Sequence, residues 1–172
     1  VEEMMPYFSD LYGNPSSMYR FAGAAGEALR TARGQVAQLI GARPEELLFT
    51  SCGTEADSTA IRSALRVRPG KRHFITTRVE HPAVLNLGKD LEKQGYLVTY
   101  LSVDERGMID LDELRHSIRD DTAVVSIMWA NNETGVLFPI GELAEITRQA
   151  GCVFHTDAVQ AVGKLPIDVS RT

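Results

Sequence analysis

Side chains that can do chemistry follow four short apolar segments of the sequence. In chain order they are Ser51–Glu55 after residues 47–50, His81 after 73–77, Asn131 and Asn132 after 123–130, and Asp157 and Gln160 after 152–156. If the apolar segments are parallel strands, their carboxyl ends lie along one edge of a sheet, where open α/β sheets bind ligands. The sequence therefore predicts a single site at that edge.

The first of these groups suits a phosphate. Ser51–Glu55 consists mainly of small and hydroxyl-bearing residues and leads into a predicted helix. Backbone N–H groups at a helix N-terminus, together with the Thr54 hydroxyl, can bind a phosphate, although an ordinary helix cap uses the same residue types. The segment lacks the spacing and the lysine of a nucleoside-triphosphate loop, so we do not expect that ligand.

His81 and Asp157 are the candidates for proton and charge chemistry. His81 precedes Pro82 at a strand-to-helix turn. A histidine there can act as a general acid or base, stack on a planar ligand, or simply face solvent. Asp157 directly follows an apolar segment, so its carboxylate needs a partner, which could be a cationic ligand nitrogen, an arginine or backbone N–H groups.

Two other patterns allow alternatives. Asn131 and Asn132, followed by Gly135, form either a tight turn or ligand hydrogen bonds. His155 and Asp157 have the His-x-Asp form of a metal-binding pair, but no third ligand has suitable spacing, so we expect no metal.

Helix-forming and strand-forming segments alternate along the chain. The predicted helices span residues 17–40, 55–67, 82–94, 111–118 and 140–150, with Gly41 as a stop and Asp110 as an N-cap. The predicted strands span residues 47–50, 73–77, 97–101, 123–130 and 152–156. Since parallel strands need crossover connections and helices supply them, the alternation predicts an α/β fold with a mostly parallel sheet and helices on both faces.

The composition is that of an ordinary soluble globular domain. The 172 residues are 44% hydrophobic and 24% charged, with a net charge of −5. No apolar run reaches the roughly 20 residues that cross a bilayer, so we expect no membrane association. A mildly acidic chain without a basic stripe argues against nucleic acid as a partner. Cys52 and Cys152 form neither a disulfide pattern nor a metal-binding pattern, so we expect a reducing, cytoplasmic compartment.

Five segments, in this order, resemble the cysteine desulfurases, which are pyridoxal-phosphate enzymes of aminotransferase class V and fold type I. They are Gly13–Ser17, Phe49–Glu55, Glu80–Leu85, Asn131–Gly135 and His155–Gln160, the last followed by Val162–Lys164. The branch of the family that the chain most resembles is the nitrogenase-associated NifS branch, on the residues Ser51–Thr54 and Met128–Ala130. The resemblance extends over nearly the whole chain and implies that the sheet is part of the cofactor-binding large domain.

The resemblance also implies roles for six residues. Gly53 and Thr54 would bind the phosphate of pyridoxal 5'-phosphate, and His81 would stack on its ring and move protons. Asp157 would pair with the ring nitrogen, and Asn132 and Gln160 would bind the phenolic oxygen or orient its neighbours. The resemblance implies no metal in this site.

The implied reaction converts L-cysteine to L-alanine and leaves a persulfide on an enzyme cysteine. The sulfur acceptor would be an iron–sulfur scaffold protein, and the enzyme would be a homodimer. Alternatives are another class V enzyme, such as a selenocysteine lyase or an aminotransferase, and a non-catalytic module that keeps the cofactor fold.

The four lysines of the chain do not match the family's cofactor-binding lysine, which we expect beyond residue 172. They are Lys71, Lys89, Lys93 and Lys164. Neither cysteine has the context of the family's nucleophile. We therefore expect an internal fragment, with an N-terminal segment at 1–16 and a partial large domain at 17–172. On its own it should be catalytically inactive and either marginally stable or prone to aggregate.

Overall fold

A computed structural model describes residues 1–171, which form two compact units. One contains residues 1–48 and 166–171, and the other contains residues 49–165. The division expected from the sequence, at residue 16, stays a prediction. The site lies in the second unit.

The first unit contains the long helix α2 (Arg20–Ile40) and the short helix α1 (Pro6–Ser9). Single 3-10 turns form at Glu2–Met4, Pro44–Glu46 and Val169–Arg171. Helix α2 ends where predicted, because Gly41 adopts a left-handed φ of 71° and donates its N–H to the Ala37 carbonyl. Within the described residues, no helix has the length and apolar character needed to cross a bilayer.

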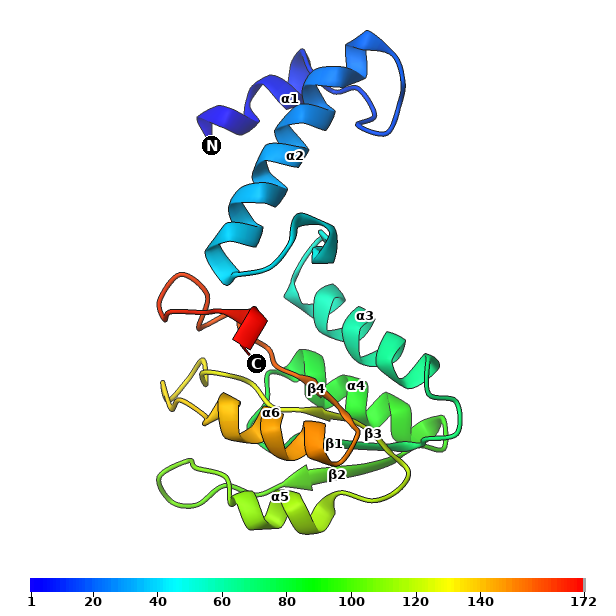
Figure 1. The fold of residues 1–172 in the computed structure, drawn as a ribbon, viewed down its shortest axis with the longest axis vertical. Helices are drawn as coiled ribbons and strands as arrows, with labels where there is room; N and C mark the ends of the chain where they lie inside the picture. The colour runs from blue at the N-terminus through cyan, green and yellow to red at the C-terminus, as the bar shows by residue number, and fades with distance from the viewer. Residues whose placement is uncertain (172) are drawn as a thin grey trace. The chain divides into compact units, whose positions relative to one another are not determined.

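Four parallel strands form the sheet of the second unit (Figure 1). They are β1 (His73–Thr77), β2 (Leu97–Leu101), β3 (Thr122–Ser126) and β4 (Val153–His155), in the order β2-β1-β3-β4. The helices between and around them are α3 (Gly53–Arg66), α4 (Pro82–Lys93), α5 (Leu111–Ser117) and α6 (Ile140–Gln149). This arrangement confirms the predicted α/β fold.

Each face of the sheet has its own core, because successive strand residues point to opposite faces. One core joins α3 and α4 to the strands through Ile61, Leu65, Val84, Leu87, Leu91, Phe74 and Val124. The other joins α5 and α6 to the strands through Leu114, Leu143, Ile146, Ile75, Leu101 and Val125. The prediction of helices on both faces is therefore confirmed.

The predicted strand at residues 47–50 is wrong. These residues belong to no strand of the sheet, and Leu48 and Phe49 are 72% and 43% exposed. An apolar run of four residues gains little from pairing when its side chains do not reach a core. The strand predicted at 123–130 is shorter than expected and ends at Ser126, although the N–H of Ile127 still donates to the His155 carbonyl at 3.1 Å.

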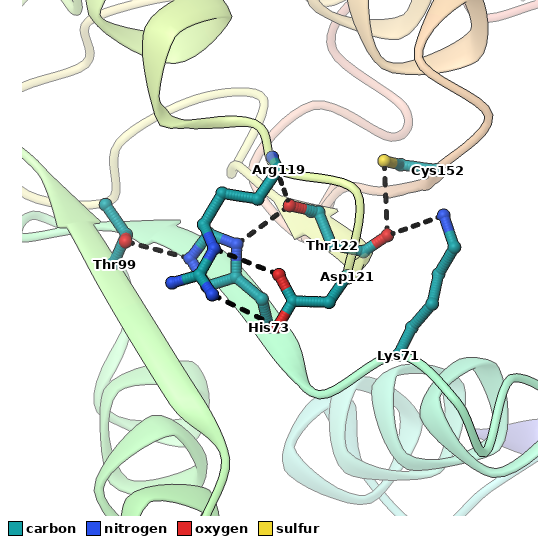
Figure 2. A network of polar contacts seen from close by, with 7 residues as sticks. All are labelled: Lys71, His73, Thr99, Arg119, Asp121, Thr122 and Cys152. Atoms are coloured by element: carbon teal, nitrogen blue, oxygen red, sulfur yellow. Dashed lines mark hydrogen bonds and ion pairs between the residues drawn. The ribbon is translucent and has the colours of Figure 1, made fainter.

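A buried polar network holds the amino ends of the strands together (Figure 2). His73 is fully buried, with Nδ1 2.8 Å from Thr122 Oγ1 and Nε2 2.9 Å from Thr99 Oγ1. The backbone N–H of Arg119 donates to the same Thr122 oxygen at 2.8 Å. Both ring nitrogens of His73 therefore pair with threonine hydroxyls, each of which can donate or accept a hydrogen bond.

Burial lowers the pKa of His73, and the charge of Arg119 lowers it further against the opposing effect of Asp121. Because the folded state holds His73 neutral, its contribution to stability is present above the ordinary histidine pKa of 6.5 and is lost as the pH falls below that value.

Thr122→Val is expected to lower the free energy of unfolding by about 1–3 kcal/mol, because it leaves the buried His73 Nδ1 and the Arg119 N–H without their shared partner. The measurement is urea-induced unfolding of the full-length gene product. Thr31→Val, the same change at an exposed position of α2, should cost less than about 0.5 kcal/mol. Equal effects of the two substitutions would show that the network does not stabilise the sheet.

Candidate functional site

A cavity of about 290 Å³ opens in the second unit and collects residues from four separate parts of the chain. Its lining consists of Gly53, Thr54, Asp57, His81, Met128, Asn132, Asp157, Val159 and Gln160. All six residues singled out from the sequence are among them. Asp57, Met128 and Val159 were not predicted.

The N-terminus of α3 forms one wall of the cavity. The N-cap residue Cys52 makes no capping hydrogen bond through its side chain to any described residue. Glu55 is engaged elsewhere, because its Oε2 accepts from the backbone N–H of Ser51 at 2.7 Å and from the Ser51 hydroxyl at 2.6 Å. The backbone N–H groups of Glu55 and Thr54 nevertheless interact with the Cys52 sulfur and lower the pKa of its thiol, so both alternatives raised by the sequence stay open. Gly53 and Thr54 line the cavity.

His81 is the N-cap of α4, and this fixes its ring. Its Nδ1 accepts from the backbone N–H of Ala83 at 3.1 Å, and Pro82 occupies the first helical position. Since Nδ1 is an acceptor, the neutral ring carries its proton on Nε2. The helix cap therefore selects one tautomer of a histidine that lines the cavity.

The sequence left open whether the two asparagines form a tight turn or face a ligand, and each of them has a different one of these positions. Asn131 builds the turn, because its Oδ1 accepts from the backbone N–H groups of Glu133 and Thr134, both at 2.9 Å. Gly135 completes the turn with a φ of 75°. Asn132 lines the cavity.

Asp157 and Gln160 lie on the segment after β4. Asp157 is 8% exposed, and its Oδ1 accepts from the backbone N–H of Val159 at 2.9 Å. Gln160 Oε1 accepts from Lys164 Nζ at 2.6 Å. The amide N–H groups of Gln160 can donate to an acceptor on a ligand.

Asp57 is the functional candidate that sequence reasoning missed. It lies four residues after Gly53 on α3, and this spacing places both on the same side of the helix. Burial and the nearby charge of Asp157 raise the pKa of Asp57 to about 6, against the opposing effect of His81. Its spacing of four residues from Gly53, in the segment expected to bind a phosphate, could have identified Asp57 from the sequence.

The family model for aminotransferase class V matches residues 1–172. The chain belongs to this family. The chain is 60% identical over 172 residues to a cysteine desulfurase of Nostoc sp. and 54% identical over 173 aligned residues to the cysteine desulfurase NifS of Azotobacter vinelandii. In both cases it spans 43% of the relative's length.

Solved structures of the family share the fold. A NifS-like protein aligns with a TM-score of 0.93 at 38% identity, covering 99% of this chain and 47% of that one. SspA in complex with cysteine aligns with a TM-score of 0.94 at 37% identity, covering 99% of this chain and 49% of that one.

The class V family uses pyridoxal phosphate, and the cavity has the chemistry to receive it. The N-terminus of α3 can offer N–H groups to a phosphate, and Gln160 can offer N–H groups to a phenolic oxygen. Two buried carboxylates, Asp57 and Asp157, form part of the wall and call for a cationic group. Among residues 1–171, no three metal-ligating side chains lie close enough to share an ion.

Glu80 is buried and hydrogen-bonded to the backbone of Met128, a residue that lines the cavity. It is 4% exposed, and its Oε1 accepts from the Thr77 hydroxyl and from the Met128 backbone N–H, both at 2.9 Å. Its Oε2 is buried and has no hydrogen-bond partner among the described residues. Burial raises the pKa of Glu80 to about 7, and the charges of Asp157 and Asp57 contribute to the rise against the two hydrogen bonds.

Glu80→Gln is expected to change how stability depends on pH. In the wild type, the unfolded chain releases the Glu80 proton near pH 4.5 and the folded chain near pH 7, so this residue costs stability as the pH rises through that window. Glutamine does not titrate and has no such cost. The free energy of unfolding of the variant, taken relative to that of the wild type, should therefore rise by up to about 3 kcal/mol between pH 4.5 and pH 7. Urea unfolding at both pH values measures the difference. A difference that does not change with pH would contradict the assignment.

Proposed function

We propose that the full-length protein containing this chain is a pyridoxal-phosphate-dependent cysteine desulfurase. It would convert L-cysteine to L-alanine and leave a persulfide on an enzyme cysteine. The observation that supports this most is the meeting of six residues around one cavity, since the sequence resemblance had assigned each of them to the same cofactor. The 50–60% identity to cysteine desulfurases supports this activity over others of class V.

Different residues of the chain would bind different groups of the cofactor. The N–H groups of Gly53 and Thr54 hold the phosphate, and the amide groups of Gln160 and Asn132 hold the phenolic oxygen. Asp157 keeps the ring nitrogen protonated, which lets the bound cofactor act as the electron sink of the reaction.

His81 would stack on the ring and hold a proton at Nε2, the atom left free by its cap on α4. From this position it can give the proton to the substrate or take one from it.

The partners follow from the same family. An iron–sulfur scaffold protein would accept the sulfur, and the enzyme would work as a homodimer in the cytoplasm. The 54% identity to a NifS protein supports a link to nitrogenase assembly. The lysine that binds the cofactor and the cysteine that takes the sulfur would lie outside the 172 residues, and these residues alone would be inactive.

The test is product analysis with the full-length gene product. Incubated with pyridoxal phosphate, L-cysteine and a thiol reductant, it should form alanine and sulfide in equal amounts, and omission of the cofactor from the apoprotein should abolish both. A keto acid as the product, or turnover of L-selenocysteine but not of L-cysteine, would contradict the proposal.

A further inference from the structure

Two carboxylates from different elements face one small cavity. Asp57 comes from α3 and is 6% exposed, and Asp157 follows β4 and is 8% exposed. The residues that line the cavity include no lysine or arginine. Placing two buried negative charges in one wall without a cation is costly, so at least one of them must be neutral or be paired with a ligand.

His155 lies beside Asp57 and contacts Ser126 through its other ring nitrogen. Its Nε2 is 3.6 Å from Asp57 Oδ1, and its Nδ1 is 2.8 Å from the Oγ of Ser126, the residue it faces across the β3–β4 pair. The side chains of His155 and Asp57 are 14% and 8% exposed. A separation of 3.6 Å is too long for a hydrogen bond, so His155 does not donate a proton to Asp57.

His155 does not supply the missing positive charge. Burial lowers the pKa of His155 to about 4, against the opposing effect of Asp157. The other titratable groups that face Asp57 are Asp157, His81 at the start of α4, and Glu80 in the preceding loop. Burial and Asp157 raise the pKa of Asp57 to about 6, so Asp57 retains its proton to a higher pH than an ordinary aspartate.

We propose that Asp57 is a second carboxylate for the cationic ring nitrogen of the cofactor, and that it releases its proton to solvent when the ring binds. This inference rests on the proposed function. The proton balance is simple: the Asp57 carboxyl loses one proton to the buffer, and the ring nitrogen keeps its own. The wall then carries two negative charges, which the ring cation stabilises.

The experiment counts protons released on binding to the full-length gene product. The ligand is 4'-deoxypyridoxine 5'-phosphate, which lacks the aldehyde and so binds without forming a covalent bond to lysine. Calorimetric titrations in two buffers with different ionisation enthalpies give the number of protons. A reference ligand with carbon in place of the ring nitrogen corrects for the phosphate and for other protein groups, after the ionisation of each ligand's own phenol has been measured separately and subtracted.

With Asp57 titrating at about 6, the ring-nitrogen ligand should release about half a proton more than the reference ligand at pH 6 and almost none more at pH 8. Asp57→Asn, which copies the shape of the neutral acid, should abolish the excess at pH 6. Asp104→Asn, the same change in an exposed turn, should leave the excess intact.

Equal proton counts for the two ligands in the wild type would overturn the inference, whether or not the Asp57→Asn variant folds. An excess that persists in a folded Asp57→Asn protein would also overturn it. Failure of the wild-type apoprotein to bind the ring-nitrogen ligand would overturn the proposed function and this inference with it.

Discussion

Asp157→Asn is expected to lower the affinity of the full-length gene product for pyridoxal phosphate by about 100-fold or more. The residue is buried at the cavity wall, and removing one partner of a buried ion pair costs about 3 kcal/mol or more, which corresponds to about two orders of magnitude in Kd. Asparagine keeps the acceptor oxygen that receives the Val159 N–H, so the local turn survives while the charge is lost. Fluorescence titration of the apoprotein measures the affinity.

Two comparisons isolate the charge of Asp157. Asp157→Ala removes both the charge and the turn, and it should weaken binding at least as much and change the absorbance of bound cofactor. Asp104→Asn makes the same chemical change in an exposed turn and should leave the affinity unchanged. Wild-type affinity and absorbance in Asp157→Asn would show that the ring nitrogen is not recognised by this carboxylate.

His81→Asn is expected to reduce the turnover of L-cysteine by about 10²- to 10⁴-fold, the range for loss of a general acid or base. Asparagine is a favourable N-cap residue and can accept from the Ala83 N–H, so α4 should keep its start. His81→Ala should show the same loss of turnover together with a small loss of stability. The measurement is alanine formation at saturating cysteine, with the cofactor content of each variant determined by absorbance.

The control for His81 is another helix cap. Asp110 caps α5 by accepting from the Asp112 N–H at 2.8 Å and does not line the cavity. Asp110→Ala should lower stability by about 1 kcal/mol without a change in turnover. Wild-type turnover in His81→Asn would refute the proton-transfer role, and a loss of turnover that only follows a loss of bound cofactor would reduce His81 to a binding residue.

The sequence predicted the fold well wherever hydrophobic patterning and helix signals agreed. The strands at 73–77 and 97–101 and the α2 stop at Gly41 form as expected. Residues 47–50 look equally apolar, but strand formation depends on a neighbouring strand and a core to cover, and neither can be seen in four residues.

The site was predictable because parallel strands bring distant segments to one edge. This principle placed His81 and Asp157 together without knowledge of the structure. It did not find Asp57, which lies within a helix rather than after a strand and whose importance depends on burial beside Asp157. The division of the asparagine pair, with Asn131 in the turn and Asn132 at the cavity, also depends on the actual turn geometry.

A crystal structure of the full-length gene product with bound pyridoxal phosphate tests the central claim most directly. We predict difference density for the phosphate at the N-terminus of α3, beside Gly53 and Thr54, with the ring lying between His81 and Asp157. Density for the cofactor elsewhere, with this cavity filled only by solvent, would contradict the account.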